Sequence, residues 1–179
     1  MLRSAPRLLA LAVVPAMLLI GAGSAHAAQN TPVFLKLDGI QGETTNAAHP
    51  GEIDVDSFDF AVSNATSEGA GGGGGAGKAT FAPIKFTKTF DKSSPALLKA
   101  VATGQHIRSA VFSFKRPGAD GFLTYTLQDV AVSSYEQGVD GPLEEQVALT
   151  YSKISVSYLP VAGPPLVTAG WDVLQNSSL

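Results

Sequence analysis

The 179-residue chain contains no cysteine. It therefore has no thiol nucleophile, no disulfide bond and no cysteine-ligated metal site. Charged residues are scarce as well, at 15%, and the 12 Lys and Arg residues are scattered along the chain rather than clustered. Nucleic-acid-binding proteins gather basic residues into a patch, so the sequence argues against a nucleic-acid partner. Apolar residues are abundant, at 45%, and their spacing along the chain indicates the secondary structure.

The N-terminus has the three-part pattern of a secretory signal peptide. Arg3 and Arg7 give it a positive start, and an apolar run extends from Leu8 to Ile20. Small residues follow. A membrane anchor is the weaker interpretation, because a spanning helix needs ~20 apolar residues and this run is shorter and contains Pro15.

The expected cleavage site follows the small residues Ala25 and Ala27, so that the mature chain begins at Ala28. Residues 1–27 are then the signal peptide, and the mature protein has no membrane segment. The protein is expected to leave by the general secretory route and to be secreted or to stay in the periplasm or cell envelope.

Most of the mature chain alternates apolar and polar residues, as β-strands do. Polar residues 41–51 and the glycine-rich residues 69–77 are expected to be loops. The tail is rich in Pro and Gly, has Trp171 as its aromatic anchor, and is expected to add at most a short edge strand. The expected strands cover residues 32–39, 52–62, 78–90, 107–116, 122–135 and 145–158.

Three of these strands change their apolar phase partway. The first change lies within residues 52–62, where apolar residues move from odd to even positions, and the others lie at Asp129 and near Ser152. A strand on one flat sheet keeps its apolar face. Each change therefore predicts a bulge, a sharp bend or a second covered face.

One short helix interrupts the strands, from about Pro95 to Thr103. Ser94 is expected to cap it, Pro95 suits the first helical position, and Gly104 suits the C-terminal stop. A helix this short is not stable alone, so it must lie on the sheet. The expected docking stripe consists of Leu97, Leu98 and Val101.

The glycine-rich segment ends in a lysine and satisfies G-x-x-x-x-G-K from Gly72 to Lys78. That is the phosphate-loop pattern, but it requires Ser or Thr next and then a helix. Here Ala79 follows, and then a strand-like segment that contains Pro83. A mobile surface loop is the better interpretation.

Other chemical sites are equally weakly supported. Glu52, Asp54 and Asp56 share one strand face but lack the glycine and closing glutamate of a calcium loop. His49 and His106 remain after export, but the chain has no G-x-S-x-G nucleophile elbow. We therefore assign no catalytic, cofactor-binding or metal-ligating residue, expect no cofactor, and rank an enzyme last.

Several segments together resemble a known family. The longest is "FTKTFDKSSPALLKAVATGQHI", from Phe86 to Ile107, and "FLKLDGIQGET", "LQDVAVSSY" and "YSKISVSYLP" lie on either side of it. Over residues 33–160 they resemble the haemolysin-coregulated protein (Hcp) family, the tube subunits of bacterial type VI secretion. The resemblance implies a mainly β fold, a β-barrel of two sheets with one short helix packed on its side.

The same resemblance implies a domain over residues 28–160 with a C-terminal tail at 161–179. It also implies a structural role without enzymatic activity. Members of the family form hexameric rings that stack into tubes, and some hold a small effector in the ring lumen. Because members usually lack a signal peptide, the signal is expected to be an addition to a complete domain. The implied partners are copies of the chain itself and an effector or peptide cargo.

Apolar residues on both faces of the strands suggest a covered outer surface. A single barrel has one interior, so some of these side chains are expected to meet a neighbouring subunit. The candidate interface residues are Phe58, Phe60, Phe112, Phe114 and Val132. The alternative function is a secreted binding module that keeps the barrel but forms no tubes.

Overall fold

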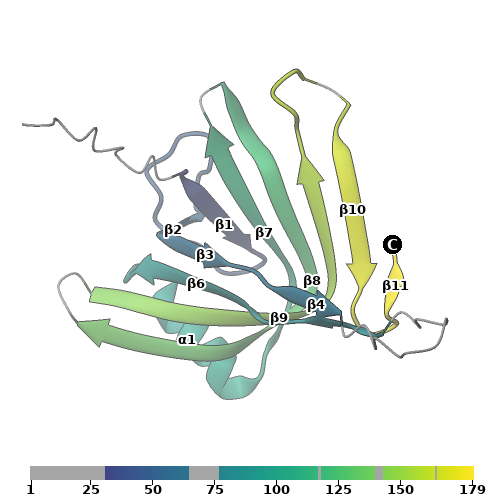
Figure 1. The fold of residues 1–179 in the computed structure, drawn as a ribbon. Helices are drawn as coiled ribbons and strands as arrows, with labels where there is room; N and C mark the ends of the chain where they lie inside the picture. Colours follow the sequence, from purple (N-terminus) through teal and green to yellow (C-terminus); the bar gives the residue numbers. More distant parts are fainter. Residues whose placement is uncertain (1–30, 65–76, 117, 140–142, 164) are drawn as a thin grey trace, which may run out of the picture.

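The computed structural model describes residues 31–64, 77–116, 118–139, 143–163 and 165–179, and most of them lie in antiparallel strands (Figure 1). The predicted signal peptide, with Ala25, Ala27 and Ala28, lies outside the described residues, as does most of the glycine-rich loop. The elements are β1 (Val33–Leu37), β2 (Ile53–Val55), β3 (Ser57–Asp59), β4 (Val62–Asn64), β5 (Ala79–Phe81), β6 (Ile84–Thr89), α1 (Ser94–Thr103), β7 (His106–Arg116), β8 (Ala119–Val139), β9 (Leu143–Tyr158), β10 (Val167–Asp172) and β11 (Ser177–Ser178).

The strands close into a barrel because β2 and β3 have different partners. β2 pairs with β1, which continues the sheet through β7, β8 and β9. β3 pairs with β6, and β6 pairs with the first half of β9. The second half of β9 pairs instead with β10. The mainly β barrel with one short helix is thereby confirmed.

The core consists of side-chain rows that run across the strands. One row joins Leu35, Phe112, Tyr125, Val156 and Ala169 in register. The first two side chains are fully buried, the next two are half-buried, and Ala169 is exposed. The barrel therefore buries the face of the sheet near β1 and leaves the face near β10 exposed to solvent.

The predicted phase changes mark a line across the sheet. On β8, Leu127 and Val130 are both buried, and Asp129 between them has a left-handed φ of 52°. On β9 the buried pair is Tyr151 and Ile154. The bend at Asp129 and near Ser152 is thus confirmed. β7 bends at the same level, between Ile107 and Ala110, a change that the sequence pattern did not reveal.

The helix has nearly the predicted limits. It runs from Ser94 to Thr103, Pro95 lies in its first turn, and Gly104 ends it with a left-handed φ of 64°. Ser94 is not the N-cap as predicted. Ser93 takes that place without a side-chain capping bond, because its hydroxyl donates to Asp91, while the Ser94 hydroxyl donates to Glu145.

The docking stripe was partly wrong. Leu97 is fully buried and Val101 is half-buried against the core, as predicted. Leu98, however, is 53% exposed, and Ala100 is buried in its place. The helix approaches the barrel closely along Leu97 and Ala100, which turns Leu98 toward solvent.

Two candidate interface residues were also wrong. Phe112 and Val132 are buried in the chain's own core. The other three, Phe58, Phe60 and Phe114, are half-buried and pack against that core. The chain bends between β2 and β3, which turns Phe58 inward until its ring lies 4.9 Å from that of Phe112.

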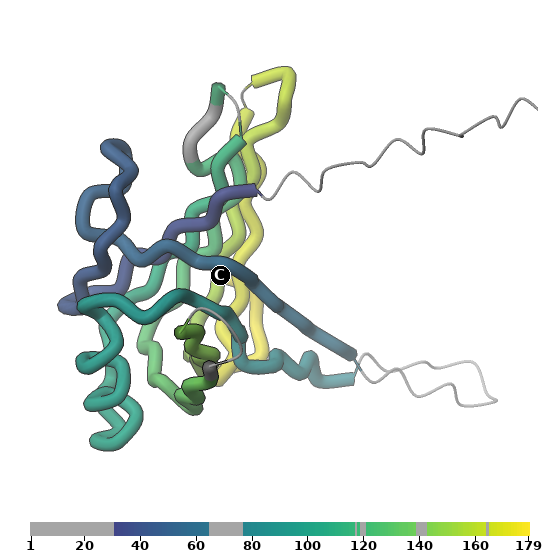
Figure 2. Tube along the Cα trace, turned by 90° about the vertical axis from the view of Figure 1, so that its left-hand side faces the viewer, coloured from purple at the N-terminus to yellow at the C-terminus, as the bar shows by residue number. Residues whose placement is uncertain are grey.

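The tail and a hairpin extend the barrel. β10 and β11 add an edge to the main sheet, as expected for the tail. β4 and β5 form a separate two-stranded sheet that projects from the barrel (Figure 2). Trp171 of β10 stacks on Phe81 of β5, with ring centroids 6.5 Å apart, which ties the two extensions together. No helix in the described part of the chain is long and apolar enough to span a membrane.

Candidate functional site

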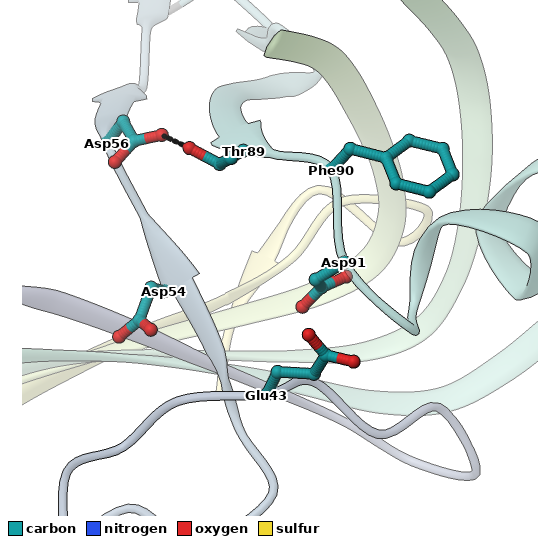
Figure 3. Close-up of a pocket in the computed structure, with 6 residues that line it drawn as sticks. All are labelled: Glu43, Asp54, Asp56, Thr89, Phe90 and Asp91. Carbon is teal, nitrogen blue, oxygen red and sulfur yellow. Dashed lines mark hydrogen bonds between the residues drawn. The ribbon is translucent and has the colours of Figure 1, made fainter. Parts of the chain in front are cut away.

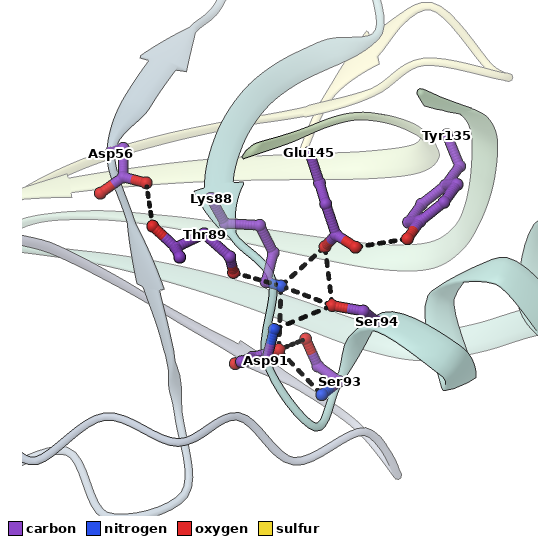
Figure 4. A network of polar contacts seen from close by, with 8 residues as sticks. All are labelled: Asp56, Lys88, Thr89, Asp91, Ser93, Ser94, Tyr135 and Glu145. Carbon is purple, nitrogen blue, oxygen red and sulfur yellow. Dashed lines mark hydrogen bonds and ion pairs between the residues drawn. The ribbon is translucent and has the colours of Figure 1, made fainter. Parts of the chain in front are cut away.

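A buried polar network lies where the helix begins (Figure 4). Lys88 of β6 is fully buried, and its Nζ donates to Glu145 Oε2 at 2.8 Å and to Ser94 Oγ at 3.0 Å. The same ammonium group lies 2.9 Å from Asp91 Oδ1. Tyr135 donates its hydroxyl proton to Glu145. The network thus joins β6, β8, β9 and the start of α1.

The charges of the network are balanced within it. Burial by itself would raise the pKa of Asp91, but hydrogen bonds from Lys88 and Ser93 outweigh it and the pKa is lowered. Burial and the negative charge of Glu145 raise the pKa of Tyr135, which keeps its proton. Each buried charge therefore has its counter-charge and hydrogen bonds, as buried ions require.

A serine beside a lysine invites comparison with nucleophilic catalysis, but this pair does not support it. A nucleophilic pair needs its lysine free to take a proton from the serine, and Lys88 is held in ion pairs with Asp91 and Glu145. Ser94 is fully buried, so no substrate reaches its hydroxyl. The network fixes the helix to the barrel rather than performing a reaction.

His49 and His106 each bind a carboxylate. His49 Nδ1 lies 2.9 Å from Glu52 Oε2, and the ring stacks on Phe34. His106 Nδ1 lies 2.6 Å from Asp129. Ser152 donates to the other oxygen of Asp129 rather than contacting His106. Neither histidine thus contacts a serine nucleophile among the described residues.

These contacts stabilise the bend in the sheet. Hydrogen bonds from Ser152 and His106 lower the pKa of Asp129 and keep it charged. The carboxylate therefore joins β7, β8 and β9 at the point where all three strands bend. The role of His106 that the geometry supports is structural.

An acidic hollow of about 210 Å³ lies beside β2 and β6 (Figure 3). Three of its carboxylates already bind protein groups. Asp54 accepts from Thr44 at 2.7 Å, Asp56 accepts from Thr89 at 3.4 Å, and Asp91 belongs to the buried network. Across the described ranges, no group of three or more His, Asp or Glu side chains is arranged to hold a metal ion.

The phosphate-loop alternative also lacks its structural requirement. Lys78 is followed directly by β5, where a phosphate loop would open a helix. Glu52, the first residue of the acidic strand face considered for calcium, is paired with His49 instead.

The outer face of the β7–β10 wall is rich in hydroxyl groups, and the ion pair of Lys153 with Asp172 lies at one end of it. Side chains alternate along each strand, so the residues between the core rows point outward. Thr124 on β8 pairs with Ser157 on β9, and Ser157 Oγ lies 3.2 Å from Thr168 Oγ1 on β10. The outward hydroxyl residues are Ser113, Thr124, Thr126, Ser155, Ser157 and Thr168.

The edge of that wall is unprotected. Among the described strands, β10 pairs with β9, and on its other side only Trp171 and Asp172 pair with β11. Val167, Thr168 and Ala169 are exposed and carry no charge. Soluble proteins usually guard an edge strand with Lys, Pro or a bulge, because it can pair with another chain. This edge is therefore a candidate surface for association.

Sequence reasoning missed the buried network, although a signal was present. Lys88 occupies the same phase as Ile84 and Phe86, which are buried, and Glu145 occupies the same phase as Val147 and Leu149. Two opposite charges in the apolar phases of two strands indicate a buried ion pair whenever the strands are neighbours.

Comparison with known proteins agrees with this architecture. The family model described as "Type VI secretion system effector, Hcp" matches residues 34–158. Protein hcp1 of Pseudomonas aeruginosa strain PAO1 is 35% identical over 157 residues, which cover 80% of this chain and 96% of the relative.

Solved structures give the same result. Hcp1 from Salmonella typhimurium superposes with a TM-score of 0.71 at 31% identity, covering 83% of this chain and 98% of that one. A structure titled as a type six secretion system protein reaches a TM-score of 0.76 at 25% identity, covering 83% and 99%. A barrel with one helix docked on a buried Lys–Glu pair, a family match across the barrel and this similarity agree: the chain belongs to the Hcp family of type VI secretion proteins.

Proposed function

We propose that this protein is an exported structural subunit that assembles into closed rings, with a lumen able to hold a small effector or peptide. The observation that carries the proposal is the 35% identity to Hcp1 along 96% of that relative. Ring formation is the property that the family resemblance implies. The partner is then a second copy of this chain.

Two surfaces described above support this proposal. The uncharged edge of β10 offers backbone groups to a neighbouring subunit. The hydroxyl-rich face of the β7–β10 wall suits the lining of a lumen, because uncharged polar groups remain hydrated and hold no cargo of one charge too tightly. We assign that face to the lumen.

Assembly into a ring of six is the first expected result. Light scattering of the purified protein at micromolar concentration should give about six times the mass of one chain, and negative-stain images should show rings with an open centre. A monomer at every concentration tested would contradict the ring and favour the secreted binding module.

Export predicts a defined N-terminus. The exported form is expected to begin at Ala28, because Ala25 and Ala27 supply the small residues before the cut and Val33 begins β1 only a few residues later. N-terminal sequencing and intact mass of protein recovered from the cell envelope or medium measure it. An Ala27→Leu variant should remain uncut, while a matched His26→Leu variant should be processed. A mature chain that retains Leu8 to Ile20 would contradict the export route.

A further inference from the structure

The barrel has a hollow where its first strands diverge. β1 and β2 pair from Val33 to Leu35, and then the chain turns at Asp56 toward β6. Among the described strands, β3 pairs only with β6, so its other edge faces a hollow of about 380 Å³. We call this the seam hollow. Its apolar lining consists of Val33, Val55, Phe58 and Phe114.

A protruding apolar turn lies near the opposite edge of the same sheet, at the same end of the strands. It connects β9 to β10, and its exposed side chains are Val161 at 85%, Leu166 at 56% and Val167 at 57%. Arg116 fixes its base by donating to the carbonyl oxygens of Leu159 and Pro160 at 2.9 and 3.1 Å. We call these three apolar residues the β9–β10 knob.

The knob cannot fill the hollow of its own chain. β1 and β10 are separated in the sheet by β7, β8 and β9, a span of about 19 Å at the usual strand spacing. Figure 1 shows β1 to the left of β7, and the β9–β10 turn at the top of the molecule to the right of β7 and β8. A chain with an apolar protrusion and an apolar hollow on different sides has the two halves of a head-to-tail contact.

Acidic side chains lie on the β2–β3 side of the seam hollow, and an arginine lies at the base of the knob. Asp56 lines the hollow and Asp59 lies next to it on β3, and both are exposed. The base of the knob carries Arg116. Opposite charges at the rim favour association and fix its orientation. This complementarity argues for a second copy of the chain rather than an unrelated apolar partner.

We propose that the β9–β10 knob of one copy inserts into the seam hollow of the next. The inference rests on the proposed ring and specifies the contact that builds it. Phe58 and Phe114, which line the hollow, then become interface residues, whereas Phe112 and Val132 stay in the core. The contact is heterologous, so each copy uses its knob toward one neighbour and its hollow toward the other.

Cross-linking tests this contact directly, because the natural chain contains no cysteine. Two single variants, Leu166→Cys at the knob and Ser57→Cys at the rim of the hollow, are mixed and treated with a short bis-maleimide. A covalent dimer should form in the mixture and not in either variant alone, and a chain with both substitutions should give a ladder up to the full ring. Lys99→Cys, an exposed position on α1, replaces Ser57→Cys in the control and should give no dimer with Leu166→Cys.

A second variant measures the strength of the contact. Leu166→Asp should weaken ring assembly at least tenfold, measured as the protein concentration at which half of the rings dissociate. At concentrations where neither protein is assembled, its unfolding midpoint should match that of the natural chain, because Leu166 is mostly exposed in the single chain.

The outcomes separate the two proposals. Rings by light scattering, without a cross-link in the mixture, would overturn the knob-and-hollow contact and leave the ring intact. A cross-link in the Leu166→Cys variant alone would show a symmetric contact and overturn the inference as well. A natural chain that stays monomeric would overturn both the ring and the contact.

Discussion

Replacing Lys88 by methionine is expected to lower the free energy of unfolding by about 3–5 kcal/mol. Methionine has a similar length and is apolar, so the main effect is electrostatic, through the loss of the ammonium charge. Glu145, only 1% exposed, would stay buried without the ammonium group that lies 2.8 Å away in the natural chain. Urea denaturation followed by circular dichroism measures the loss.

The control and the compensating variant make this test specific. Lys85→Met, on the solvent side of the same strand, should change stability by no more than about 0.5 kcal/mol. Adding Glu145→Leu to Lys88→Met should recover at least about 2 kcal/mol, because replacing both partners of a buried pair removes the unpaired carboxyl group. An unchanged midpoint for Lys88→Met would mean that the pair is not buried as described.

Truncating Leu97 to alanine is expected to lower the free energy of unfolding by about 2–5 kcal/mol, as other buried leucines do. Its neighbour Leu98 provides a matched control, since the same Leu98→Ala change affects a side chain that is 53% exposed. That variant should stay within about 0.5 kcal/mol of the natural chain. Chemical denaturation of the natural chain, Leu97→Ala and Leu98→Ala measures the two losses of stability.

The same pair of positions tests the placement of the helix on the barrel. If Leu98→Ala proved the more damaging change, the helix would be rotated relative to the structure. Equal losses at both positions would instead indicate that Leu98 is covered by another subunit in the assembled protein, and dilution below the assembly concentration would then remove its effect.

The helix illustrates how far sequence reasoning reached. Pro95 and Gly104 fix its ends through backbone geometry, which is local, so its limits were predictable. Its rotation was not. Leu97 with Leu98 and Val101, or Leu97 with Ala100 and Val101, are both acceptable apolar stripes in the sequence. Only the close approach of the helix to β8 decides between them, because it favours the small Ala100.

The candidate site likewise combines features that the local sequence predicts with features that depend on the whole fold. Alternation predicted which strands exist and where the sheet bends, because a change of phase is local. It did not predict that Phe112 and Val132 would be buried inside the chain, since that depends on how the barrel closes around them. It also passed over Lys88 and Glu145, because pairing β6 with β9 brings together residues far apart in the chain.

Barrel closure also bears on the order in which the protein folds. β7, β8 and β9 follow one another in the chain and pair as consecutive strands, so they need only short chain segments to meet. Closure instead requires Val33 to find Phe114 and Ile84 to find Leu149. Contacts between distant residues carry the larger loop-closure entropy and form slowly. The three-stranded meander is therefore expected to form first and the barrel to close last, and until it closes the apolar rows of the meander stay open to other unfinished chains.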